Sequence, residues 1–208
     1  ILYGNYNIAI GRSNLGSNDD DPAAGSTDNN IAIGSEAGKA LTTGSGNIAI
    51  GDEANQRSTT GNDVISIGEN SLRNAGTGIS TGVFIGTNVS SSNTASGIRN
   101  TAVGPNCLGK LTTGTHNTVL GTYAGYNITT GDYNIGIGSN GLGYSFSGNA
   151  LTGDHNIGIG FESGHAITSG NNNIALGQSS LRGTTTSCQN IAIGTSALRC
   201  GTLTGIEN

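Results

Sequence analysis

The chain repeats one short pattern of aliphatic and small residues from end to end. A block of the form Asn-Ile-Ala-Ile-Gly, or a close relative, ends at eleven anchoring glycines, and most intervals between them are 17 or 18 residues. The anchoring glycines are Gly11, Gly34, Gly51, Gly68, Gly86, Gly104, Gly121, Gly138, Gly160, Gly177 and Gly194. Within each block, branched residues alternate with Ala, Gly or Ser, and alternation with period two predicts a β-strand.

The length of the repeat decides which fold these strands build. A unit of 17 residues that is rich in glycine and β-branched residues is too short and too poor in helix formers for a helical repeat. It has the length of one coil of a solenoid. We therefore predict an all-β protein, a parallel β-solenoid (β-roll or β-helix) of about eleven to twelve coils of 17–18 residues, with residues 1–208 forming a single repeat array.

Stacked coils place equivalent residues above one another, so each column of the repeat becomes a ladder. The aliphatic residues one and three positions before the anchoring glycine are expected to be buried. The Asn four positions before it is expected to form an amide ladder that satisfies backbone groups at a corner, and the glycine itself to sit in a turn. Typical ladder residues are Asn47, Ile48, Ile50 and Gly51, then Asn117, Leu120 and Gly121, then Asn190, Ile191, Ile193 and Gly194.

A second wall is expected from the segment that follows the anchoring glycine. It contains an Ala three positions after the glycine and the Leu or Ile of a Leu-Thr-Thr block. Two insertions, near residues 17–22 and 143–149, interrupt the period at the same phase and should project from one corner. Neither end carries a capping segment, which predicts a fragment or a segment of a fibre.

Composition excludes several classes of function. Only 10% of the residues are charged and the formal net charge is -5, so no basic surface for nucleic acid is expected. The apolar runs are far too short to cross a membrane. Glycine accounts for 37 of 208 residues and aromatic residues for 4%, which is an unusual composition for an enzyme domain. We expect no enzymatic activity, no nucleic-acid binding and no membrane insertion.

The block A-x-x-x-L-T-T-G-x-x-N-I-A-I-G resembles the head repeats of trimeric autotransporter adhesins. It is also similar to the Asn-Thr-Ala-Ile-Gly arrays of long fibre and tail-fibre-like proteins, with Asn100-Thr-Ala-Val-Gly104 and Asn117-Thr-Val-Leu-Gly121 as the nearest copies. The resemblance covers the whole chain. It implies a left-handed parallel β-roll that trimerises, although the period here is about three residues longer than in the adhesin heads.

Two groups of acidic residues are weak candidates for a metal site. Asp132 and Asp154 lie in adjacent coils beside His155, one position before a column that contains His116 and Tyr133. Carboxylates one coil apart beside a histidine have the chemistry to hold a cation, but a solvated face with an aromatic ladder explains them more simply.

The other group is Asp19, Asp20 and Asp21, which has the ligand type that calcium prefers but lacks the spacing of a known calcium loop. Calcium is the only cofactor that either group suggests. Because neither group has the ligands or the spacing of a known calcium site, we predict that the protein has no cofactor. The three cysteines, Cys107, Cys188 and Cys200, form no metal-binding motif.

These observations predict an extracellular structural or adhesive fibre protein on a cell, virion or matrix surface, which associates with itself as a fibre or trimer. A cell-surface glycan or matrix component would be a second partner. The alternatives are a phage or virus tail-fibre segment that binds a receptor, and an ice- or polysaccharide-binding solenoid with a Ser/Thr column. Adjacent threonines such as Thr42 and Thr43 point to opposite faces, so only one outward rank is expected, whereas an ice lattice needs two.

Overall fold

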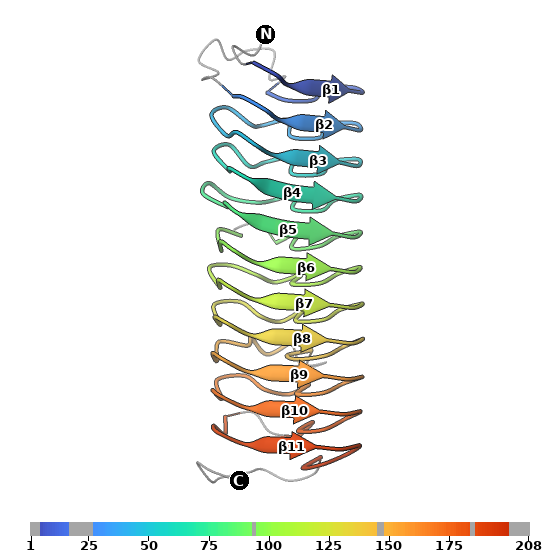
Figure 1. Ribbon diagram of the computed structural model, residues 1–208, viewed down its shortest axis with the longest axis vertical. Helices are drawn as coiled ribbons and strands as arrows, with labels where there is room; N and C mark the ends of the chain where they lie inside the picture. The colour runs from blue at the N-terminus through green and yellow to red at the C-terminus, as the bar shows by residue number, and fades with distance from the viewer. Residues whose placement is uncertain (1–4, 17–26, 93–94, 145–147, 184–185, 200–208) are drawn as a thin grey trace.

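Eleven short strands stack into one parallel sheet that follows the long axis of the molecule (Figure 1). The computed structural model describes residues 5–16, 27–92, 95–144, 148–183 and 186–199. The strands are β1 (Ile8–Ile10), β2 (Ile31–Ile33), β3 (Ile48–Ile50), β4 (Val64–Ile67), β5 (Gly82–Ile85), β6 (Thr101–Val103), β7 (Thr118–Leu120), β8 (Ile135–Ile137), β9 (Ile157–Ile159), β10 (Ile174–Leu176) and β11 (Ile191–Ile193). Each pairs in parallel with the next coil at equivalent positions of the repeat.

The predicted all-β parallel solenoid is therefore confirmed, and the described residues contain no helix. In Figure 1 the strands cross the near side from left to right while the chain returns behind them and descends, which is left-handed winding. The chain makes about nine turns of about 17 residues, slightly fewer than the eleven to twelve coils expected. Residues 17–22 of the first insertion and residues 145–147 of the second lie outside the described ranges, as do both chain ends.

The strands turn their small residues inward, which corrects the expectation that the aliphatic columns are buried. In β3, Ala49 is 2% exposed, whereas Ile48 and Ile50 on either side are half-buried on the outer face. The same pattern holds in β8, where Gly136 points inward between Ile135 and Ile137. Alternation correctly separated two faces of the strand, but the interior of so short a coil has no room for two columns of isoleucine.

Large side chains enter the core from the segment that returns between strands. Leu108, at the fourth position after an anchoring glycine, and Leu111, at the seventh, are both fully buried. The alanines at the third position, such as Ala37 and Ala124, are fully buried as well, so the predicted second wall is confirmed. One hydrophobic cluster runs from Val64 to Ala192 and a second contains Leu15, Ala32, Ala37, Leu41, Ala49 and Ala54.

The asparagine column forms the expected amide ladder. Asn117 donates its side-chain amide to Asn100 Oδ1 at 3.1 Å and to the Gly131 carbonyl at 2.9 Å, while its own Oδ1 accepts the Asn134 N–H at 2.9 Å. All of these groups lie inside the molecule, where a polar group without a partner is costly. The ladder thus ties each coil to the coils before and after it.

The amide ladder is interrupted where the core changes. Val64 and Gly82 replace the asparagine in two successive coils. In β5 the inward position is filled by Phe84, and a Cβ on Gly82 would lie 2.5 Å from a carbon of its ring. The Phe84 ring thus occupies the space that an asparagine side chain would need, and apolar packing replaces hydrogen bonding in this coil.

The anchoring glycines are required by both conformation and space. Gly121 has φ of 129°, which L-residues with a side chain rarely adopt. A Cβ built there would lie 2.7 Å from the carbonyl oxygen of Gly138 in the next coil. At this spacing between coils, no residue with a side chain fits in the glycine column without displacing the next coil.

Replacing an anchoring glycine should weaken the stacking of two coils. We expect Gly121→Ala to lower the free energy of unfolding by about 2 kcal/mol or more, because backbone strain and overpacking add. Gly78→Ala is the control, since Gly78 also has positive φ (93°) but has nothing within 4 Å of the added Cβ. Urea denaturation followed by circular dichroism measures both. Equal losses would show that strain alone, without the contact between coils, explains the glycine column.

Candidate functional site

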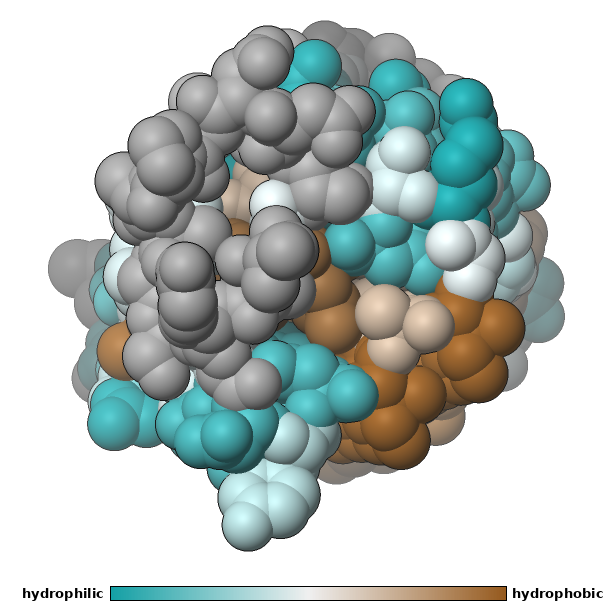
Figure 2. Space-filling view, turned by 90° about the horizontal axis from the view of Figure 1, so that it is seen from above, coloured by the Kyte–Doolittle hydropathy of each residue, from teal (hydrophilic) through white to brown (hydrophobic). Residues whose placement is uncertain are grey.

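The outward residues of β1–β11 form a continuous aliphatic face along one side of the rod. At every strand both outward positions are aliphatic, except that Thr101 and Thr118 occupy the first position of β6 and β7. The exposed fraction reaches 58% at Ile10, 49% at Leu120 and 68% at Ile193. Seen along the axis, hydrophobic residues gather at the lower right of the molecule, on the side where Figure 1 shows the strands (Figure 2).

The dimensions of the aliphatic face follow from the stacking of the strands. Eleven strands spaced by about 4.8 Å extend over about 50 Å, and two columns about 7 Å apart give an apolar strip on the order of 500 Å². The largest apolar patch on a soluble monomer typically covers about 300–600 Å² and is often functional, so this strip is a candidate interaction surface. The strip repeats at every coil along the rod, so it fits a partner that is equally long and regular.

A hollow interrupts the aliphatic face near its middle. It is lined by Asp63, Ile65, Thr81, Gly82, Val83, Arg99, Asn100 and Thr101. It lies beside Gly82, which has no side chain where most coils carry an asparagine. Asp63, Thr81 and Arg99 belong to the column five positions before the anchoring glycine, which borders the aliphatic face with polar and aromatic residues.

Asp132 and Asp154, the candidate metal ligands, act as acceptors for the backbone of the preceding coil. Asp132 Oδ1 accepts the Thr115 N–H at 2.6 Å and the Thr115 hydroxyl at 3.0 Å, and Asp154 Oδ1 accepts the Asp132 N–H at 2.8 Å. Within the described ranges, no three His, Cys, Asp or Glu side chains converge as a metal site requires. Asp19, Asp20 and Asp21 lie outside the described residues.

This acceptor column is a second side-chain ladder that the sequence analysis missed. Other coils use Asn62, which accepts the Ser45 N–H at 2.9 Å, and Asn171, which accepts the Asp154 N–H at 2.7 Å. A column restricted largely to Asp, Asn, Ser and Thr, six positions before the glycine, was the available signal, because these side chains commonly hydrogen-bond to nearby backbone groups.

The aromatic column expected beside the two aspartates is present. Tyr133 stacks between His116 and His155, with ring centroids 4.6 Å and 5.1 Å apart and the planes nearly parallel. All three residues have φ between 55° and 58°, so the backbone presents each ring in the same direction. Tyr133 is 50% exposed, and the stack therefore forms part of the outer surface.

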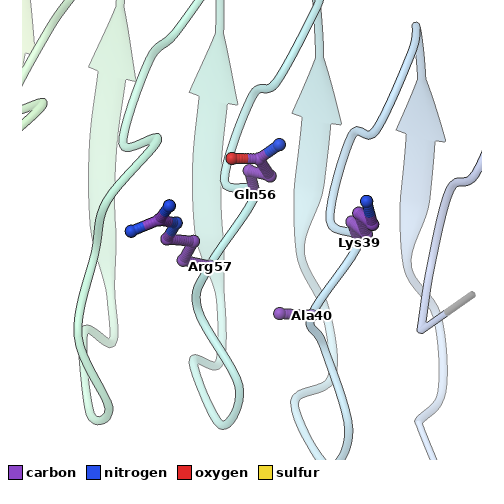
Figure 3. Close-up of a pocket in the computed structure, with 4 residues that line it drawn as sticks. All are labelled: Lys39, Ala40, Gln56 and Arg57. Carbon is purple, nitrogen blue, oxygen red and sulfur yellow. The ribbon is translucent and has the colours of Figure 1, made fainter. Parts of the chain in front are cut away.

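The face opposite the strands, here called the rear face, carries ion pairs between coils. Arg73 contacts Glu53 at 2.6 Å and Arg182 contacts Glu162 at 2.8 Å, in each case from one coil to the previous one. Hydrogen bonds from Lys39 and Gln56 lower the pKa of Glu36. A shallow pocket on this face is lined by Lys39, Ala40, Gln56 and Arg57 (Figure 3).

The cysteines and threonines do not form a reactive or ligand-binding site in the part of the chain that the structure describes. Cys107 is buried, and burial raises the pKa of its thiol to about 11, so it remains an unreactive thiol in the wall. Cys188 accepts the Asn171 N–H through its sulfur at 3.3 Å, and Cys200 lies outside the described residues. Thr42 bonds to the Thr59 carbonyl at 3.1 Å while Thr43 is exposed, so only one of the two threonine ranks faces water.

Comparison with known proteins gives no relative: no family model, no curated protein and no solved structure matches the chain. In the part of the chain that the structure describes, no helix has the length and hydrophobicity to cross a membrane.

The role of Asp132 and Asp154 can be tested with one substitution that removes only the negative charge and another that also removes the hydrogen-bond acceptor. Asp132→Asn keeps an oxygen acceptor, as Asn62 and Asn171 do in other coils, and should change the free energy of unfolding by less than about 0.5 kcal/mol. Asp132→Ala leaves the Thr115 N–H without its acceptor and should cost about 1–2 kcal/mol. Thermal unfolding with calcium and with a chelator completes the test. Stabilisation of the wild type by calcium that is lost in Asp132→Asn would indicate a metal site instead.

Proposed function

We propose that the protein is an extracellular structural and adhesive fibre protein, whose copies associate side by side through the aliphatic face into a homomeric bundle or filament. The observation that carries this proposal is that two largely aliphatic columns lie half-buried or exposed on the outer face over all eleven strands. An isolated rod in water gains free energy when this strip is covered, at about 25 cal/mol for each Å² of apolar surface removed from water.

A second copy of the same chain is the partner that suits this surface best. The strip has no charged residue in its two columns and repeats at the spacing between coils, so a parallel copy presents the same aliphatic ladder over the same length. Its area, on the order of 500 Å², approaches the roughly 800 Å² per partner of a standard stable interface. The bordering column can supply the remainder, since Tyr133 and His155 are exposed beside the strip.

Rigidity, the other requirement of a fibre, follows from the contacts between coils. Backbone hydrogen bonds, the asparagine ladder and the acceptor column all run parallel to the axis. Bending the rod would stretch several of these ladders at once. The sequence resemblance to trimeric adhesin heads and to tail-fibre-like repeats agrees with a mechanical role, and the receptor-binding segment of a tail fibre is the variant of the proposal that this resemblance supports.

A charged residue introduced on the aliphatic face should prevent association without unfolding the single chain. We expect the wild type to sediment as an oligomer at micromolar concentration and Ile137→Asp to sediment as a monomer with an unchanged circular dichroism spectrum. The reason is that Ile137 is half-buried on the outer face, where a carboxylate stays hydrated in the single chain but would be desolvated in an interface. Analytical ultracentrifugation measures both.

Thr113→Asp provides the matched control, because Thr113 is exposed outside the two aliphatic columns and gains the same charge. It should associate like the wild type. A monomeric wild type, or equal dissociation of both variants, would contradict association through the aliphatic face. Loss of the β-sheet spectrum in Ile137→Asp would mean that this column supports the fold of the single chain.

A further inference from the structure

The rear face carries one group of aromatic side chains, contributed by four successive coils. The aromatic patch consists of Lys110, Tyr123, Tyr126, Tyr144 and His165. The Tyr144 ring centroid lies 5.2 Å from that of Tyr123, 5.9 Å from that of Tyr126 and 5.8 Å from that of His165. Lys110 Nζ lies 5.6 Å from the centroid of the Tyr126 ring and donates to the Gly148 carbonyl at 3.4 Å.

The aromatic patch replaces the ion pairs that occupy the same columns elsewhere. Positions two and five after the anchoring glycine hold the pairs Glu53 with Arg73 and Glu162 with Arg182, each between adjacent coils. At the same phases one coil carries Tyr123 and Tyr126. The column at position five has glycine in the coils on either side of Tyr126, so no neighbouring side chain separates its ring from the rod surface.

Exposure distinguishes the patch from a buried core cluster. Tyr123, Tyr126, Tyr144 and Lys110 are half-buried, and only His165 is buried. Desolvation lowers the pKa of His165, which keeps its imidazole neutral near pH 7. The half-buried part of the patch therefore consists of three tyrosines, each with a ring and a hydroxyl group, and one ammonium group that already has a carbonyl and a ring as partners.

This combination suits a sugar better than other ligands. A pyranose ring has an apolar face of C–H groups, which packs on an aromatic ring, and a rim of hydroxyls, which need hydrogen-bond donors and acceptors. Tyrosine supplies both from one side chain. Because Lys110 is the only cation among the five residues and is already engaged, the patch favours neutral sugars over anionic ones.

We propose that the aromatic patch binds neutral pyranose units of a glycan. The proposal deepens the adhesive role proposed above and rests on it. The patch lies on the rear face and the aliphatic face lies on the strand side, so glycan binding and self-association use different surfaces. Either one can therefore be lost without the other.

The test is a titration of the chain with three neutral probes, cellotetraose, maltotetraose and lacto-N-tetraose. The Ile137→Asp chain with ¹⁵N-labelled tyrosine keeps the protein monomeric for NMR, and its six tyrosines give six reporters. We expect at least one probe to shift the signals of Tyr123, Tyr126 and Tyr144 while the Tyr133 signal stays fixed. Tyr126→Ala and Tyr144→Ala should each weaken binding about tenfold, and Tyr126→Phe should keep it within about threefold.

Tyr133→Ala is the matched control, since Tyr133 is also exposed and stacked but lies in another column. It should bind like the parent chain. No shift with any of the three probes, or shifts at Tyr133 without shifts at the patch, would overturn the proposal. If the alanine variants unfold, the pattern of shifts in the parent chain still decides between the two outcomes. Failure of the proposed assembly would appear separately, as a monomeric wild type that still binds the probe.

Discussion

The whole structure depends on one constraint: each coil must close in about 17 residues while its backbone groups pair with the coils above and below. Strand residues donate to the next coil, as Ile31 does to the Asn47 carbonyl at 2.8 Å. Residues five positions before and two positions after the anchoring glycine donate to the preceding coil, as Tyr133 does to the Thr115 carbonyl at 3.0 Å. Both positions are left-handed, and a third left-handed position, four after the glycine, donates to the next coil again, as Leu108 does to the Ala124 carbonyl at 3.2 Å. Each costs about 1 kcal/mol or more for a residue with a side chain, and the hydrogen bonds between coils must outweigh it.

The same constraint explains which parts of the fold could be predicted from sequence. Coil length, strand positions, register, the glycine column and the asparagine ladder all repeat strictly, and stacking converts a repeated residue directly into a contact. The left-handed positions were missed because their residues vary from Tyr133 to Leu108, and only the backbone must be uniform there. The enrichment in Asn, Asp and His at the bends was the one local signal, since these residues tolerate this conformation better than most.

The inside and outside of the strands could not be decided by alternation alone. A closed coil of this length holds one wall of large side chains, and the return segment supplies it with Leu108, Leu111 and their equivalents. The strand must then present its small residues inward, and the isoleucines are left outside. The usual rule that large aliphatic residues are buried within one chain predicts instead that the isoleucines lie inside and the small residues outside. It becomes valid again if the proposed assembly covers these residues with a second copy.

Some columns of the repeat hold the coils together through side-chain hydrogen bonds, and others lie on the surface. This difference determines which residues are available for binding. Asp132 and Asp154, the candidate metal ligands, accept hydrogen bonds from the backbone of the preceding coil and so contribute to the scaffold. Outward columns contribute backbone hydrogen bonds to stacking, and their side chains, which in some coils form ion pairs or ring stacks, differ between coils. Two such regions are distinctive: an aliphatic face on the strand side and an aromatic patch on the rear face. Because the two are on opposite sides of the rod, copies joined through the first would display the second outward, repeated on every copy. Weak contacts to single sugars would then add up along the bundle, since the linked sites act as one multivalent surface.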